Sequence, residues 1–265
     1  MKNNFKRFLN YLLKFALAFL LLSLASVIVY RFAPIPYTAL MFWKSTDALI
    51  KGEPVGINKK WVPINEISKA MQTAVIKAED DKFYQHHGFD FEAIDKAIKY
   101  NKTHKKQKGA STISQQTAKN VFLWPSRNWI RKGMEVYFTV LIELLWSKER
   151  ILEAYLNVIE LGPGVYGVEA ASQKYFHKKA KSLTLSQASL IAAILPNPIK
   201  FKIDKPSAYI LKRQRKIMGR GFVVATQKSS QENAQKIENA SQNSDEFFDI
   251  KFDEDEEPSA DSTNL

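Results

Sequence analysis

The stretch VYFTVLIELLW, residues 136–146, carries the strongest fold signal in this 265-residue chain. Its apolar side chains fall on every side of a helix, a pattern typical of a helix buried at the centre of a domain. About a dozen apolar residues are too few to cross a bilayer. We therefore predict one central helix from Trp129 to Trp146, with the rest of a domain packed around it.

Helical periodicity and capping residues recur on both sides of this central helix. Asn65 is expected to cap a helix that ends near Glu79, and Asp90 to begin the next. The further start signals are Ser111 or Thr112, Ser147, and the capping box of Thr184 with Gln187 before Leu185–Leu195. Strand alternation is nearly absent, so the predicted fold class is all-α, predominantly helical.

An apolar segment near the N-terminus, Tyr11 to Phe32, predicts one membrane-spanning helix. Its 22 residues would extend about 33 Å, enough for the hydrocarbon core. Lysine and arginine residues precede it, so the positive-inside rule places the N-terminus in the cytoplasm and the remainder outside. The alternative is a cleaved signal peptide, with small residues at 24–26, but the apolar run continues to Tyr30.

Composition divides the chain into five parts: cytoplasmic residues 1–10, the transmembrane helix 11–32, a linker with short extended pieces at 33–62, a domain at 63–220 and a tail at 221–265. Residues 228–265 hold eleven acids against three lysines, a charge of −8, and we expect the tail to be disordered. The net charge of +12 then leaves +20 for residues 1–227. Such a basic exported domain suits anionic lipids or a phosphorylated substrate, and its membrane anchor argues against nucleic acid.

The segment EDDKFYQHHGFD, residues 79–90, is the first candidate for chemistry. Three adjacent carboxylates oppose one another's ionisation, which can raise the pKa of one towards neutrality, as a general base requires. His86 and His87 lack partners at metal-ligand spacing, so His86 is expected to brace the turn before Gly88. The chain has no cysteine, which excludes disulfides and thiolate metal sites.

Two further groups of polar residues follow. Thr112, Gln115, Gln116 and Lys119 share a helix stripe, which indicates a polar ligand or a merely solvated face. Arg127, Arg131, Lys132 and Glu135 lie within nine residues. A gain in helix stability would explain the second group poorly, because an exposed i,i+4 ion pair adds only about 0.2 to 0.5 kcal/mol. Cations beside a carboxylate suit a diphosphate leaving group.

Five motifs in order carry a resemblance to a known family: EDDKFYQHHGFD, GASTISQQTAKN, RKGMEVY, KERILEAYLNVIELGPGVYGVEAAS and LTLSQASLIAAILPNP. Over roughly residues 45–220 the chain resembles the peptidoglycan glycosyltransferase family, which also forms half of class A penicillin-binding proteins. The resemblance implies a lysozyme-like helical domain. No transpeptidase motif follows, so a monofunctional member is expected.

The resemblance also implies residue roles. Glu79 matches the family's general base and Glu135 its second carboxylate, while Lys119 and Arg127 match cations that contact the diphosphate. Other positions of the cleft are matched by Asp80, Ser111, Gln116, Asn120, Arg131 and Lys132. No cofactor is implied, although Mg²⁺ or Mn²⁺ accompanies the diphosphate in some members.

The implied activity is polymerisation of lipid II into β-1,4 glycan strands, with inversion at the anomeric carbon of MurNAc and release of undecaprenyl diphosphate. The implied location is the inner membrane, with the catalytic domain in the periplasm. Cell-wall synthesis or division proteins are candidate partners, which the sequence does not identify. One alternative is a lysozyme-like hydrolase or lytic transglycosylase, which has no need of a cationic diphosphate site. Another is an inactive membrane-tethered scaffold, against which the retained Glu79, Glu135, Lys119 and Arg127 argue.

Overall fold

The computed structural model describes residues 2–54, 56–105, 107–126 and 128–219, with side chains described from residue 4. Its helices are α1 (Lys2–Phe32), α2 (Ala39–Ile50), α3 (Lys69–Glu79), α4 (Phe91–Thr103), α5 (Ile113–Phe122), α6 (Trp129–Leu145), α7 (Lys148–Val158), α8 (Val168–Phe176) and α9 (Leu185–Ile194). Short 3-10 turns lie at Ile64–Glu66 and Ala180–Ser182, and residues 208–219 are also helical. The predicted tail, 221–265, lies outside the described residues.

Strands make up very little of the described chain. β1 (Asn58–Lys59) and β2 (Val165–Tyr166) pair in parallel over two residues each, with Asn58 opposite Val165. The predicted all-α class is therefore confirmed.

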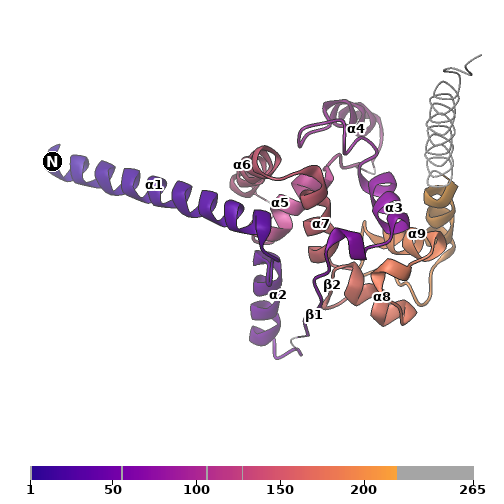
Figure 1. The fold of residues 1–265 in the computed structure, drawn as a ribbon. Coiled ribbons are helices and arrows are strands. Elements are labelled where there is room, and N and C mark those ends of the chain that lie inside the picture. Colours follow the sequence, from indigo (N-terminus) through magenta and orange to yellow (C-terminus); the bar gives the residue numbers. More distant parts are fainter. Residues whose placement is uncertain (1, 55, 106, 127, 220–265) are drawn as a thin grey trace, which may run out of the picture. The chain divides into compact units, whose positions relative to one another are not determined.

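The core forms where α5 packs against both α6 and α7, and where α3 packs against α9 (Figure 1). Stacked rings of Phe122 and Phe138, with centroids 4.5 Å apart, join α5 to α6. Ile142, Leu152 and Leu156 are fully buried beside them. Helices whose apolar stripes meet in this way gain most of their stability from packing rather than from intrinsic propensity.

The central helix is only partly as predicted. The bounds of α6 agree with the expectation, but only one side, with Phe138, Thr139 and Ile142, is buried. Ile130 and Leu144 are each 75% exposed, and Val136 and Val140 are also exposed. The second half of α6 is apolar on every side, but protein covers only one of those sides.

The N-terminal half of the chain departs from prediction at two places. Residues 39–50 form the helix α2, capped by Thr38, where a linker with extended pieces was expected. The helix leading to Glu79 is capped by Ser68 rather than Asn65, which lies in a 3-10 turn. Both residue types accept hydrogen bonds from helix amides, so the cap position was decided by tertiary packing.

Other caps agree with the sequence. Asp90 caps α4, Ser147 caps α7, and the capping box of Thr184 with Gln187 begins α9. Of the two residues proposed to cap α5, the structure uses Thr112, in a second capping box with Gln115.

Thr112 also ties α5 to the preceding turn, because its hydroxyl donates a hydrogen bond of 2.6 Å to the carbonyl of Gly88. Gly88 has a φ of +88°, and a Cβ there would lie 2.9 Å from Cγ2 of Thr139. Glycine is therefore required for this turn to approach α6.

We predict that Thr112→Ala lowers the free energy of unfolding by about 2 kcal/mol, since it removes a helix cap and a buried hydrogen bond. Thr112→Ser keeps the hydroxyl and serves as the matched control. Thermal unfolding of the detergent-solubilised protein measures both. Equal melting temperatures for the two variants would contradict this role.

Candidate active site

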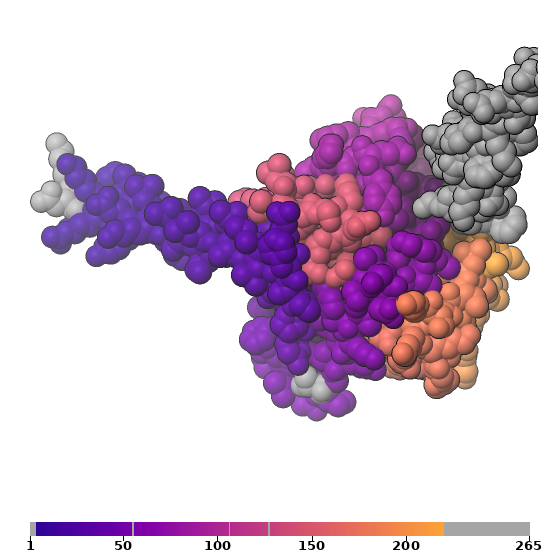
Figure 2. Space-filling view, viewed as in Figure 1, coloured from indigo at the N-terminus to yellow at the C-terminus, as the bar shows by residue number. Residues whose placement is uncertain are grey.

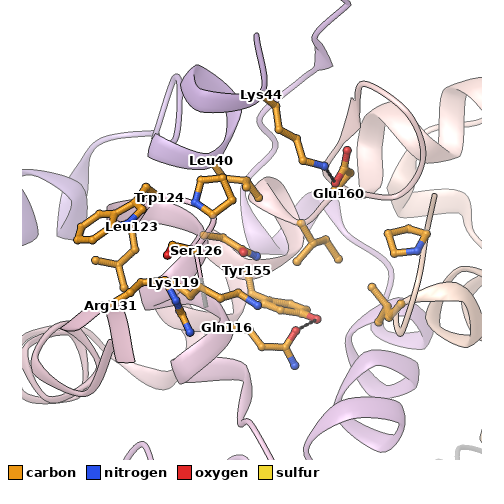
Figure 3. A pocket seen from close by; sticks show the side chains of 15 residues that line it. Leu40, Lys44, Gln116, Lys119, Leu123, Trp124, Ser126, Arg131, Tyr155 and Glu160 are labelled. Atoms are coloured by element: carbon orange, nitrogen blue, oxygen red, sulfur yellow. Dashed lines mark hydrogen bonds and ion pairs between the residues drawn. The ribbon is translucent and has the colours of Figure 1, made fainter. Parts of the chain in front are cut away.

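A pocket of about 560 Å³ opens between α2, α5 and the end of α7 (Figure 3). Polar and apolar side chains share its wall. Its lining residues are Leu40, Lys44, Gln116, Lys119, Asn120, Leu123, Trp124, Pro125, Ser126, Arg131, Tyr155, Ile159, Glu160, Leu195 and Pro198.

One stripe of α5 supplies the polar floor of the pocket. Gln116, Lys119, Asn120 and Leu123 follow helical spacing and all line the pocket. The predicted ligand-facing stripe is therefore half right. Gln116 and Lys119 face the pocket, whereas Thr112 and Gln115 form the capping box.

Glu79 ends α3 next to this stripe, although it does not itself line the pocket. The Nε2 of Gln116 donates to its Oε2 at 2.9 Å, and the Tyr155 hydroxyl donates to Oε1 of Gln116 at 3.2 Å. Arg213 places Nη2 3.5 Å from Oε1 of Glu79. The amide of Gln116 thus connects the carboxylate to the pocket wall.

The pKa of Glu79 is raised, as predicted, but the main cause differs from the one proposed. Removal from water is the largest effect, while the Gln116 hydrogen bond and the charges of Arg213 and Lys119 oppose it. The neighbouring charge of Asp80 is the smallest contribution. Desolvation, rather than crowding of carboxylates, makes Glu79 hold its proton more tightly.

The other two carboxylates of the acidic run point elsewhere. Asp80 is buried, and its Oδ2 accepts from the backbone N–H of Ile113 at 2.9 Å, at the start of α5. Its Oδ1 lies 2.8 Å from Nε2 of His86, which confirms the bracing role expected of that histidine. Asp81 pairs with Lys77 at 3.2 Å. Asp80 thus joins the end of α3 to the start of α5 instead of lining the pocket.

Glu135 is buried between two cations of its own helix. Arg131 pairs with its Oε2 at 2.7 Å, and Lys132 pairs with Oε1. Arg131 also lines the pocket, so this cluster forms one of its walls. The structure brings these three predicted residues together.

Lys119 is a cation of the pocket wall. Among the described residues it forms neither a hydrogen bond nor an ion pair, and the pocket walls lower its pKa by removing it from water. The charge of Glu135 opposes that effect and those of Arg131 and Lys132 add to it. A cation held without a direct partner is ready to bind an anion.

The remaining predicted residues divide three ways. Asn120 lines the pocket, and Ser111 is exposed just before the cap of α5. Arg127 lies outside the described residues.

Residues near the site that were not predicted include Leu40, Lys44, Glu160 and Arg213. Arg213 lies in a run of basic residues whose pattern does not distinguish it. Leu40 and Lys44 fall in the segment interpreted as a linker. Tyr155, for which packing was favoured over shaping the cleft, does both, since it is fully buried and lines the pocket.

No group of three or more His, Cys, Asp or Glu side chains suited to a metal ion is found within the part of the chain that the structure describes. A magnesium or manganese ion that arrives with a diphosphate stays a prediction.

Comparison with known proteins identifies the family. Residues 48–221 match the family model described as "Transglycosylase". The chain is 55% identical over 260 residues to a biosynthetic peptidoglycan transglycosylase of Bdellovibrio bacteriovorus, covering 98% of this chain and 100% of that protein. It is 50% identical over 214 residues to the protein of that name from Pasteurella multocida, covering 80% and 87%. A Bacteroides thetaiotaomicron protein of that name is 51% identical over 213 residues, covering 80% and 86%.

We predict that Glu79→Gln is more stable than the parent protein at neutral pH. The folded state raises the pKa of Glu79, so ionised Glu79 costs stability, and this cost grows as pH rises above the usual pKa. The difference in melting temperature between variant and parent should therefore increase from about pH 4 to about pH 8. A difference that is constant or decreases with pH would contradict the desolvation of Glu79.

Proposed function

Because the chain belongs to the transglycosylase family, we propose that it is a membrane-anchored peptidoglycan glycosyltransferase that polymerises lipid II. One observation carries this proposal. Gln116 joins the desolvated Glu79 to the same helix stripe from which Lys119 faces the pocket. A proton acceptor at the end of α3 is thus hydrogen-bonded to the helix that presents a cation to the pocket.

Glu79 is proposed as the general base. It would take the proton from the 4-hydroxyl of the acceptor's GlcNAc as that oxygen attacks C1 of the donor's MurNAc, with inversion. A raised pKa suits this role, since a base works best when its pKa lies near the working pH. Gln116 holds the carboxylate by a hydrogen bond that favours its ionised form.

The departing group would be undecaprenyl diphosphate, whose charge grows as the C1–O bond breaks. Lys119 offers a positive point charge, and Arg131 offers a planar guanidinium at the same pocket. Glu135 fixes that guanidinium by a 2.7 Å ion pair. We propose that Glu135 acts by positioning Arg131 and Lys132.

A lysozyme-like hydrolase would also use a glutamate of raised pKa, but as an acid. The cations of the pocket favour synthesis, because hydrolysis of a glycan releases no diphosphate. Incubation of the solubilised protein with labelled lipid II should give glycan strands much longer than one disaccharide. Shortening of preformed strands without polymerisation would overturn the proposal.

We predict that Glu79→Gln lowers the rate of polymerisation by about 100- to 10,000-fold, the usual contribution of a positioned general base. Asp81→Asn is the matched control, because it neutralises an adjacent carboxylate that pairs with Lys77. The control should polymerise lipid II at nearly the parent rate. Similar rates for the parent and Glu79→Gln would exclude Glu79 as the base.

The membrane anchor packs directly on the catalytic domain. α1 has the length and composition to cross a bilayer. The hydroxyls of Ser23 and Tyr137 lie 2.6 Å apart, and Nε1 of Trp146 donates to the carbonyl of Val27 at 2.8 Å. Arg150 donates to the carbonyl of Tyr30 at 2.8 Å, near the end of α1. Figure 2 shows α1, in indigo, meeting the pink surface that includes α6.

These contacts bring α6 beside the outer half of the anchor, since Ser23 lies about 14 Å before the end of α1 at 1.5 Å per residue. We propose that the exposed apolar side of α6, Ile130, Val136, Val140 and Leu144, enters the outer leaflet of the inner membrane, with the pocket on the periplasmic side. An exposed apolar stripe is costly in water and stable in lipid.

This placement can be measured because the chain has no cysteine. A polarity-sensitive fluorophore on Leu144→Cys should report an apolar environment in bilayers and be quenched by spin-labelled lipid. The same label on exposed Lys181→Cys, in the 3-10 turn Ala180–Ser182, is the control and should report water. Equal spectra from the two positions would contradict the insertion of α6.

A further inference from the structure

Lys44 lines the pocket but lies outside both the sequence motifs and the residues that match the family model. It lies on α2, whereas the matched residues begin at 48. Its ammonium group pairs with the carboxylate of Glu160, beyond the end of α7, and both residues line the pocket. In Figure 3 the dashed line joins the two side chains near the top of the view, with Lys119 and Arg131 lower in the same pocket.

Anchoring of α2 does not require this ion pair. Met41 is fully buried, and Thr38 is buried and caps the helix. The Lys44 side chain remains 40% exposed, so its pairing contributes little to stability. The position of a lysine in the pocket wall calls for another reason.

The side chains of Lys44 and Glu160 differ in how firmly the surrounding protein holds them. Glu160 is only 13% exposed and is bridged to Tyr166 through the backbone. Burial raises the pKa of Tyr166, and the charge of Glu160 and a hydrogen bond to it raise this pKa further. Lys44 has a flexible stem with three donors. The carboxylate is therefore fixed, and the ammonium group is the one that can change partner.

The location of Lys44 suits the phosphate of a membrane lipid. α2 begins seven residues after the end of α1, so it is the first helix after the membrane anchor. With α1 across the membrane, a lipid-linked diphosphate would lie where the lipid meets water, near the helix that follows the anchor. An anion entering the pocket would then meet Lys44 as well as Lys119 and Arg131.

On the premise of the proposed function, we propose that Lys44 is a further cation of the substrate site: Glu160 holds it until a phosphate of the lipid diphosphate takes its place as partner. The exchange replaces one charge-assisted contact by another, so the ammonium group is never left unpaired in the pocket. Glu160 in turn makes the site selective, because an uncharged ligand cannot compete for Lys44.

Two substitutions separate this role from a structural one. Lys44→Met and Glu160→Gln both abolish the ion pair, but only the first removes the cation. Binding of undecaprenyl diphosphate in detergent micelles should weaken about tenfold in Lys44→Met, the loss expected for one charge-assisted hydrogen bond. In Glu160→Gln, binding should be unchanged or tighter, since Lys44 is released. Lys51→Met, which removes an exposed cation paired with Asp47 on the same helix, is the control and should bind normally.

Equal weakening in Lys44→Met and Glu160→Gln would show that only the ion pair matters and would overturn the proposal. So would parent-like binding in Lys44→Met. Polymerisation of lipid II by the parent protein separates these outcomes from failure of the proposed function. If the parent polymerises lipid II while Lys44→Met binds normally, the Lys44 proposal alone is overturned. If the parent neither polymerises lipid II nor binds undecaprenyl diphosphate, both proposals are overturned.

Discussion

The buried carboxylate of Asp80 fixes the relation between two helices on which the site depends. By accepting the N–H of Ile113 it joins the end of α3 to the start of α5, where the helix dipole also favours a negative charge. Glu79 is the preceding residue, and Gln116 lies one turn into α5. The bond of Asp80 therefore sets the distance at which Gln116 reaches Glu79. A carboxylate used for structure thus holds in position the neighbouring residue that is proposed as the base.

Three helices contribute different kinds of side chain to the pocket. α5 supplies the polar stripe, and α6 supplies Arg131 on one side while turning apolar residues outward on another. α2 closes the wall just after the membrane anchor. α1 is hydrogen-bonded to α6 and α7, so the anchor and two helices that line the pocket are held together. Under the proposed function, a lipid-linked substrate would meet the site at the membrane surface.

Local signals predicted the helices well because caps and apolar periodicity act over a few residues, as at Asp90, Ser147 and Thr184. They failed where tertiary contacts decide, as in α2 and the exposed side of α6. The closeness of Glu79, Gln116 and Lys119 could be expected from motifs. The partnership of Glu79 with Arg213, 134 residues later, and of Lys44 with Glu160 could not, since no local pattern records which distant segments meet.

The proposed chemistry depends most on Glu79, a desolvated base whose ionised form is stabilised by Gln116. The acid limb of kcat/KM for lipid II against pH reports the pKa of this base in the free enzyme. We predict that the pKa read from this limb lies above the usual carboxyl value of 4.5. In Gln116→Leu the limb should move to still higher pH, because that variant loses the hydrogen bond that lowers the pKa of Glu79. A limb at or below 4.5, or one that Gln116→Leu leaves in place, would contradict the account.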